Sequence, residues 1–186
     1  MRLQDGWLED AQICPSAHFN SRPPGEVVSL LVVHNISLPP GEFGGGHVQQ
    51  FFCGQLDSSL HPYFTDIADL RVSAHFLIER DGVISQFVNC DQRAWHAGQS
   101  CYAGRADCND FSLGVELEGT DETPYTDAQY QALAELSKAL QAAYPAITRQ
   151  RITGHEFIAP GRKTDPGNAF DWRRYLRSLL AFSPNQ

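Results

Sequence analysis

Residues able to carry out chemistry gather in the stretch 153–167, which reads Thr-Gly-His-Glu-Phe-Ile-Ala-Pro-Gly-Arg-Lys-Thr-Asp-Pro-Gly. Its glycines and prolines disfavour a long helix, so the chain can loop from His155 back to Asp165. Such a loop brings an imidazole and a carboxylate to one point, and both are suitable zinc ligands. Lys163 would add a positive charge beside them. An ordinary surface loop with a scattered histidine and aspartate is the alternative, because short motifs also match by chance.

A second candidate site lies at the end of an apolar run. Leu30-Leu31-Val32-Val33 is typical of a buried central strand, and His34 and Asn35 follow it directly. Polar residues at the carboxyl edge of a central strand often form a site. A core histidine bonded to a backbone carbonyl is the alternative. The spacing alone does not favour His34 over His75 or His96 as a further ligand beside the first stretch.

Glu116 lies in a segment of alternating polarity. In residues 112–119, Leu113, Val115 and Leu117 alternate with polar residues and glycine, which predicts a strand with one apolar face. Glu116 would lie on the other face. A solvated glutamate is the alternative, but if both faces of the sheet are covered, this carboxylate is buried and needs a reason.

Other residues are weaker candidates. Tyr63 lies in the long irregular segment 37–70, which we interpret as a wall or lid over a site. Arg71 precedes a predicted hairpin and is either a ligand for a carboxylate or a solvated charge. Trp95 could stack on a sugar or fill the core, and His96 is equally open as a helper or a filler.

Composition limits the class of protein. The chain has 186 residues, 42% hydrophobic and 19% charged, which indicates one globular domain. The net charge is -8 and no basic run occurs, which argues against nucleic acid and anionic membrane surfaces as partners. An anionic ligand would need local cations, and twelve of the fourteen basic residues are arginines. We expect a monomer.

The cysteines and the N-terminus indicate a compartment. Five cysteines are present without a C-x-x-C pair, so neither a disulfide framework nor a cysteine zinc site is expected. The first ten residues are acidic and lack the apolar segment of a secretory signal. No apolar run approaches the ~20 residues of a membrane span. We therefore expect a cytoplasmic protein with free thiols.

The elements that must position these residues predict an α/β domain, with one mixed sheet flanked by helices. Residues 126–143 have apolar residues at helical spacing, with Thr126 and Gln129 as a capping box. Further elements are a hairpin at 72–88 turning at Asp81-Gly82, short helices at 48–53 and 170–180, and a strand at 152–153. Residues 1–28 are expected to be an irregular lead-in, with the catalytic core at about 29–181 of the single domain 1–186.

Several motifs resemble one family. They are Leu31-Val32-Val33-His34-Asn35-Ile36-Ser37-Leu38-Pro39-Pro40-Gly41-Glu42-Phe43-Gly44, His61-Pro62-Tyr63-Phe64, Arg71-Val72-Ser73-Ala74-His75, Arg93-Ala94-Trp95-His96-Ala97-Gly98, Cys108-Asn109-Asp110-Phe111-Ser112, Gly114-Val115-Glu116-Leu117-Glu118-Gly119-Thr120-Asp121, Thr153-Gly154-His155 and Lys163-Thr164-Asp165-Pro166-Gly167. Together they resemble the AmpD-type 1,6-anhydro-N-acetylmuramoyl-L-alanine amidases. The wider group comprises zinc amidases that share a fold with peptidoglycan recognition proteins.

The resemblance implies a complete site. His34, His155 and Asp165 would hold Zn²⁺, with Glu116 as general base and Lys163 as electrostatic stabiliser. The substrate would be a small muropeptide from peptidoglycan recycling, cut between the lactyl group of N-acetylmuramic acid and L-alanine. Asn35, Tyr63, Arg71 and Trp95 are the candidate substrate-binding residues. The family often has a further arginine where this chain has Asp107, so recognition of the peptide near Arg105 is expected to differ.

Two other functions remain open on the sequence. A peptidoglycan-fragment binding module without catalysis would lose ligands, whereas all three ligands and both polar helpers are present here. A structural zinc protein would need a fourth protein ligand and no open position.

Overall fold

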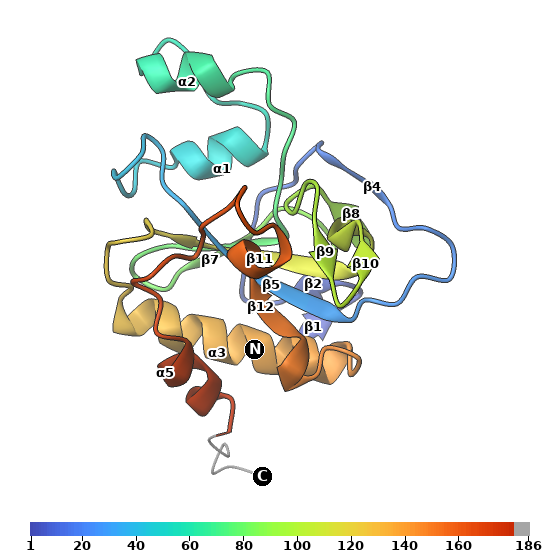
Figure 1. Ribbon diagram of the computed structural model, residues 1–186. Helices are drawn as coiled ribbons and strands as arrows, with labels where there is room; N and C mark the ends of the chain where they lie inside the picture. Colours follow the sequence, from blue (N-terminus) through green and yellow to red (C-terminus); the bar gives the residue numbers. More distant parts are fainter. Residues whose placement is uncertain (181–186) are drawn as a thin grey trace.

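A computed structural model describes residues 1–180 and has one mixed six-stranded sheet at its centre (Figure 1). The strand order is β12 (Ile152–Gly154), β5 (Leu30–Ile36), β11 (Ser112–Glu118), β6 (Phe76–Ile78), β7 (Ile84–Gln86) and β3 (Gln12–Ile13). Neighbouring strands are parallel except β6 and β7, which form the antiparallel hairpin expected around Asp81-Gly82. The predicted α/β fold with a mixed sheet and flanking helices is confirmed.

The two central strands β5 and β11 are buried on both faces. All seven residues of β11 are buried, as are the first five of β5. Their parallel register pairs Glu116 with His34 and Gly114 with Val32. Because alternate residues of a strand point to opposite faces, the register places Glu116 and His34 on the same face.

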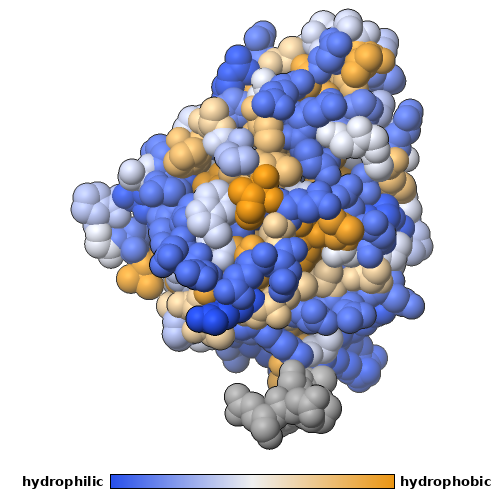
Figure 2. All heavy atoms as spheres, turned by 180° about the vertical axis from the view of Figure 1, so that it is seen from behind, coloured by the Kyte–Doolittle hydropathy of each residue, from blue (hydrophilic) through white to orange (hydrophobic). Residues whose placement is uncertain are grey.

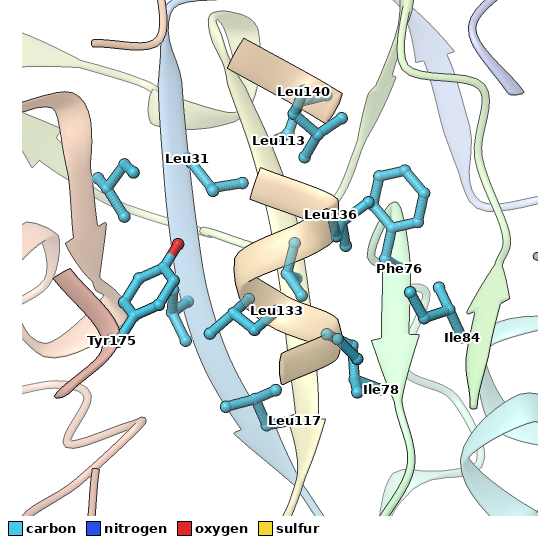
Figure 3. Packing of buried hydrophobic residues seen from close by; sticks show 14 of the residues in the cluster. Leu31, Phe76, Ile78, Ile84, Leu113, Leu117, Leu133, Leu136, Leu140 and Tyr175 are labelled. Carbon is cyan, nitrogen blue, oxygen red and sulfur yellow. The ribbon is translucent and has the colours of Figure 1, made fainter. Parts of the chain in front are cut away.

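Helix α3 (Asp127–Ala143) covers the other face of the sheet. Leu133, Leu136 and Leu140 are fully buried and meet apolar side chains of β5, β11 and β6, as Figure 3 shows. The capping box predicted from the sequence begins the helix, because Thr126 accepts from the Gln129 backbone and Gln129 accepts in return. Helix α5 (Trp172–Ser178) packs beside α3, with the Asp171 side chain as its N-cap.

Helices α1 (His47–Phe52) and α2 (Pro62–Ile67) stand on the opposite side of the sheet from α3 and α5 (Figure 1). Segment 37–70 is therefore more ordered than the sequence suggested, since the prediction included α1 but not α2. Helix α2 has Pro62 in its first turn, and the His61 side chain caps it by accepting from the Tyr63 backbone at 3.1 Å. Proline at this position pre-sets the helical backbone, a signal that the six-residue length of the helix obscures.

The expectation of an irregular lead-in was wrong. Residues 1–28 contain four short strands: β1 (Leu3–Gln4), β2 (Trp7–Leu8), β3 and β4 (Phe19–Ser21). β1 pairs with β2, and β3 extends the central sheet beside β7. Strands of two or three residues are too short to show a period, so the pattern could not reveal them. The expected start of the core at residue 29 omits this sheet edge, and its expected end at residue 181 lies outside the described residues.

Arg22 shows how the lead-in is attached to the domain. Its guanidinium donates to the backbone oxygens of Asn109, Asp110, Cys90 and Ser112 at 2.8–3.1 Å. One partly buried cation therefore joins the lead-in to the segment that enters β11.

Two further two-stranded antiparallel sheets and two short helical turns complete the fold. β4 pairs with β8 (Gln92–Ala94), and β9 (Cys101–Tyr102) pairs with β10 (Arg105–Ala106). The turns are η1 (Cys108–Asp110) and η2 (Arg149–Arg151), and the four-residue helix α4 (His155–Ile158) follows β12. On the face in Figure 2, hydrophobic residues appear in small groups among hydrophilic ones. In the described part of the chain, no helix has the length and apolar character of a membrane span.

Candidate zinc and catalytic site

The carboxyl ends of β5 and β12 bring two histidines together. His34 lies near the end of β5, and His155 begins α4 directly after β12. β12 pairs with β5 so that Gly154 lies beside Val33. The residues that follow them, His155 and His34, therefore lie at the same edge of the sheet. The loop after α4 then returns, and the Glu156 backbone donates to the Asp165 carbonyl at 2.9 Å. The sheet register and this loop thus unite residues far apart in sequence.

Three possible ligand atoms converge. His34 Nδ1 and His155 Nδ1 are 3.0 Å apart, and each lies 3.0 Å from Asp165 Oδ2. Ligands at about 2.0–2.1 Å from a tetrahedral zinc ion lie roughly 3.3 Å from one another. The triangle is therefore of the size that a zinc ion requires, and it contains the three ligands expected from the sequence.

The hydrogen bonds behind the triangle favour a cation inside it. His155 Nε2 lies 3.1 Å from the Ala97 carbonyl, which can only accept, so this nitrogen carries the proton and Nδ1 carries a lone pair. His34 Nε2 lies 2.9 Å from His96 Nδ1 and also faces away from the triangle. Lone pairs brought together in a buried place repel unless a positive charge lies between them. The donor set therefore fits a zinc ion.

Electrostatics agree with this interpretation. Burial lowers the pKa of His34 to about 4, so its imidazole is neutral and able to bind a metal. Burial also opposes ionisation of Asp165, but the imidazoles of His155 and His34 more than offset it and lower the pKa of this carboxyl. Asp165 is therefore anionic and His34 is neutral, which is the protonation state that zinc ligands of these types need.

Glu116 faces the same centre from β11. It is 8% exposed, and its buried Oε2 has no hydrogen-bond partner within residues 1–180. Burial raises the pKa of Glu116 well above its ordinary value, and the Asp165 carboxylate adds to this while Lys163 opposes it. A buried carboxylate without a partner costs stability. The sequence indicates that a buried Glu116 would need a functional reason, and Glu116 is buried in the structure.

Lys163 is an exposed residue that lines the same cavity. Its backbone donates to the Ala159 carbonyl at 3.0 Å, which fixes the start of the side chain. Its positive charge contributes to the lowered pKa of His34 and partly offsets the raised pKa of Glu116. A cation thus stands beside the triangle and the unpartnered carboxylate.

The cavity over this centre has a volume of about 360 Å³. Asn35, Tyr63 and Trp95 line it, as expected of substrate-binding residues, together with apolar side chains of α1, α2 and the segment before α1. Those apolar residues include Leu38, Phe51, Phe52 and Ile67, all within the segment 37–70. This segment is the one interpreted from the sequence as a wall or lid over a site.

Two of these candidates are held by polar partners. Asn35 donates through Nδ2 to Asp121 Oδ1 at 2.8 Å and to the Pro166 carbonyl at 3.1 Å. Trp95 donates through Nε1 to Asn20 Oδ1 at 2.7 Å and lies nearly parallel to the His18 ring. Both side chains are therefore set in orientation before any ligand arrives.

Arg71 lies outside the main cavity. It lines a smaller adjoining pocket of about 220 Å³, with His18 and Leu70. Its Nη1 donates to the Ala68 and Leu70 carbonyls at 3.1 and 3.4 Å. The structure therefore does not bring Arg71 to the reacting centre, and a role for it concerns a more distant part of a ligand.

The region of Asp107 is arranged differently from a simple cationic patch. Arg105 pairs with Glu26 and stacks on the Phe111 ring at 4.2 Å. Asp107 itself has a positive φ of 58°, directly before η1. Arg105 is thus already engaged by an acidic partner, and the expected difference in peptide recognition stays a prediction.

His96 is the nearest neighbour of the site that the sequence left undecided. Its Nδ1 contacts His34, and its backbone and that of Ala97 donate to Asn109 Oδ1 at 3.1 and 2.8 Å. Burial lowers the pKa of His96 well below its ordinary value, so the ring is neutral. His75, the other histidine that spacing left open as a ligand, instead accepts from the Gly114 backbone at 3.0 Å and is not part of the triangle.

Comparison with known proteins identifies a family. The family model described as N-acetylmuramoyl-L-alanine amidase matches residues 11–168. The chain is 61% identical to the 1,6-anhydro-N-acetylmuramyl-L-alanine amidase AmpD of Citrobacter freundii, over 100% of this chain and 98% of that protein. It is 59% identical to AmpD of Escherichia coli strain K12, over 94% of this chain and 95% of that protein.

Solved structures agree. A crystal structure of a selenomethionine AmpD derivative matches with a TM-score of 0.94 and 59% identity, covering 96% of this chain and 99% of that one. The amidase AmiD of E. coli, in complex with anhydro-N-acetylmuramic acid-L-Ala-D-gamma-Glu-L-Lys, matches with a TM-score of 0.60 and 30% identity. That match covers 84% of this chain and 60% of that one.

Proposed function

The chain belongs to the N-acetylmuramoyl-L-alanine amidase family and is an amidase of the AmpD type; from this premise we propose how its own residues perform the reaction. The substrate is an anhydromuramyl-peptide derived from the cell wall. The bond cut joins the lactyl carbonyl of the sugar to the nitrogen of L-alanine. This role in muropeptide recycling has the support of the AmpD relatives and of the AmiD complex with such a ligand.

We propose that His34, His155 and Asp165 hold one zinc ion. The support is the 3.0 Å triangle of ligand atoms, with the outer nitrogen of each imidazole already hydrogen-bonded. When bound, such an ion lowers the pKa of a water molecule and polarises a carbonyl. No fourth residue joins the three among those described, which leaves an open position and argues against a purely structural zinc site.

Glu116 is the proposed general base and then the general acid. It accepts a proton from the attacking water and passes it to the leaving nitrogen, so the C–N bond breaks. The acid's remaining proton also ends on the amine, and a lactyl carboxylate and a protonated amine result. The buried Oε2 of Glu116 has no hydrogen-bond partner within residues 1–180, so it is available to take up and release this proton. Lys163 stabilises the negative charge that develops on the carbonyl oxygen.

The remaining candidates are proposed to hold the substrate. Trp95 offers a flat face to the sugar, and Asn35 and Tyr63 contact the groups around the scissile bond. Arg71, in the adjoining pocket, would hold a carboxylate of the peptide stem. Arg71→Ala is expected to raise KM for stems that carry this carboxylate, and an unchanged KM across a stem-length series would remove this role.

One observation carries the proposal most directly: the buried, unpartnered Oε2 of Glu116, which lies on the same face as His34 and lines one cavity with all three ligand residues. A peptidoglycan-binding module without catalysis has no use for such a carboxylate, which costs stability and binds nothing. The amidase relatives also favour the enzyme over the binding module.

Compartment and assembly are proposed from weaker support. All five cysteines lie within the described residues and are free, as in proteins of a reducing compartment. We therefore keep the cytoplasm and a monomeric state as proposals. Cell fractionation and light scattering of the purified chain test them, and a periplasmic location or a stable dimer would overturn the respective proposal.

The decisive experiment is mass spectrometry of an anhydromuramyl-tripeptide incubated with the purified protein. Free tripeptide and the anhydro sugar acid are expected, gaining one water between them. A strong chelator should stop the reaction and added Zn²⁺ should restore it. Cleavage that persists in metal-free protein would defeat the zinc assignment, and cleavage at another bond would defeat the reaction. The same muropeptide with a reducing-end sugar measures the preference for the anhydro form.

A further inference from the structure

We propose that His96 is a positioning residue that fixes the tautomer of His34 and so directs the His34 Nδ1 lone pair into the zinc site. This inference rests on the zinc site proposed above. It assigns a function to a histidine that the proposed mechanism leaves without one. It concerns a chain of hydrogen bonds that begins at His34 and ends at a backbone carbonyl.

The chain has three links. His34 Nε2 lies 2.9 Å from His96 Nδ1, and His96 Nε2 lies 3.1 Å from Ser112 Oγ. Ser112 Oγ in turn lies 2.6 Å from the Cys108 carbonyl oxygen. His34 and Ser112 are buried and His96 is partly buried, so the two ends of this chain of bonds are shielded from water.

The far end of the chain sets the direction of every proton. A carbonyl oxygen can only accept, so the Ser112 hydroxyl donates to Cys108 and its oxygen accepts from His96 Nε2–H. A neutral imidazole carries one proton, so His96 Nδ1 then has a lone pair and accepts from His34 Nε2–H. His34 Nδ1 is left with the lone pair that faces His155 and Asp165.

His155 obtains the same result by a shorter route. Its Nε2 donates directly to the Ala97 carbonyl at 3.1 Å. His34 Nε2 instead contacts His96, which is linked through Ser112 to the Cys108 carbonyl. Ala97 follows His96 in the chain, so a single segment orients both histidines of the triangle.

The position of His96 is fixed by its surroundings. A Cβ on Gly114 would lie 2.4 Å from His96 Cγ, so the ring occupies the space that any side chain at this strand position would fill. Gly114 has no positive φ, and its role in the strand is this close approach. Asn109 holds the backbone of the same segment through two hydrogen bonds. The ring therefore has little freedom to turn away from His34.

Outer partners of metal-bound histidines commonly change metal affinity by about 10–100-fold when they are removed. The acceptor at His96 Nδ1 is expected to act in this range. Without it, His34 Nε2–H loses its partner in a buried place, and the opposite tautomer, which directs a proton at the metal, becomes competitive. The effect appears in zinc binding itself and does not depend on turnover.

The test compares His96→Leu with His96→Asn, two side chains of nearly the same shape. Asn can place Oδ1 where the His96 Nδ1 acceptor lies, whereas Leu offers no acceptor. Zn²⁺ affinity is measured against a competing chelator in wild type and both variants, with thermal unfolding of the metal-free proteins as the check on folding. His96→Leu should bind zinc about 10–100-fold more weakly, and His96→Asn should recover most of the loss.

Nitrogen-detected NMR of the histidine rings gives a second measurement on the unaltered protein. His96 should carry its proton on Nε2 in the zinc-loaded form, assigned by the signal that disappears in His96→Asn. A proton on His96 Nδ1 would overturn the inference, as would equal zinc affinity in wild type and a folded His96→Leu. Equal losses in the two variants would assign the effect to packing and also overturn it. Failure of the wild-type protein to bind zinc would instead remove the proposed metal site on which the inference rests.

Discussion

The two faces of strands β5 and β11 bury different kinds of side chain. Toward α3, Leu31, Val33, Leu113, Val115 and Leu117 form an apolar core with Leu133 and Leu136 (Figure 3). On the other face, His34 and Glu116 lie at paired positions of the same two strands, buried but polar. One face lowers the free energy of the folded state by burying apolar area. The other accepts an unpartnered carboxylate and three converging ligand atoms.

The difference shows where stability and chemistry are separated in this fold. A strand alternates its side chains, so one backbone can serve both purposes without compromise at any single residue. Substitutions on the site face should change metal binding and rate more than stability, and substitutions on the core face should do the reverse. The predictions below test that separation, beginning with the largest effect.

Loss of the Asp165 carboxylate should abolish zinc binding. Asp165→Ala removes one of three ligands and the only carboxylate in the triangle, leaving two imidazoles. Elemental analysis of the purified variant should find no zinc, and activity should be absent. The exposed carboxylate of Asp107 provides the control, since Asp107→Asn should keep one zinc per chain. Metal content that survived in Asp165→Ala would remove this residue from the ligand set.

Glu116→Gln should separate the metal from the proton transfer. The amide keeps the size of the side chain but cannot accept the proton, so the rate should fall by roughly 10²–10⁴. Both kcat and kcat/KM should decrease, because the role is exercised in the transition state. Zinc content and substrate affinity should remain near the wild-type values. A metal-free variant would make Glu116 a ligand, and a fully active zinc-loaded variant would assign the proton transfer to another group.

The core face should give the opposite result. Leu133 is fully buried between α3 and the sheet, so Leu133→Ala should lower the free energy of unfolding by about 2–5 kcal/mol. Well below its unfolding temperature the variant should keep wild-type kcat/KM and zinc content. Denaturant unfolding measures the loss, with exposed Val27→Ala as the control, expected within about 0.5 kcal/mol of wild type. A large fall in kcat/KM would show that the faces are coupled.

The same contrast explains what the sequence could predict. The core face follows a period, so helix α3, its capping box and the alternation of β11 could be predicted from residues alone. Strands of two or three residues, as in the lead-in, show no period, and their pairing depends on partners far along the chain. Helix α2 is six residues long and was missed for a similar reason.

The site face could be predicted only in part. The residue types and the loop from His155 to Asp165 suggested a metal site, but spacing could not select His34 among the histidines. The family resemblance selected it, and the 3.0 Å triangle agrees. The contact of His96 with His34 depends on the β5–β11 register and on the space above Gly114, which are three-dimensional facts without a local pattern. Arg71 lines a neighbouring pocket, a placement that its motif could not indicate, and its role in substrate binding stays a prediction.

The smallest predicted effect compares the stability of metal-free wild type with that of metal-free Glu116→Gln as pH changes. Burial raises the pKa of Glu116 in the folded protein, whereas in the unfolded chain it is about 4.3. Between these two values the folded state holds a proton that the unfolded state has lost. Stability of the wild type therefore falls as pH rises through this window. Glutamine does not titrate, so the variant escapes this loss.

The stability of the variant relative to that of the wild type should therefore increase from about pH 4 upward. This difference should become constant above the pKa of Glu116 in the folded protein. Asp165 has the opposite shift, with its stabilisation lost as pH falls, but both proteins contain it and it largely cancels in the difference. The metal must be absent, because a cation beside the carboxylate would lower its pKa. Unfolding temperatures across the pH range measure the difference, with Glu135→Gln, an exposed carboxylate on α3, as the control. A difference that stays constant with pH would mean that Glu116 is ionised in the folded protein without cost, and the two faces of the sheet would then not differ in the way argued here.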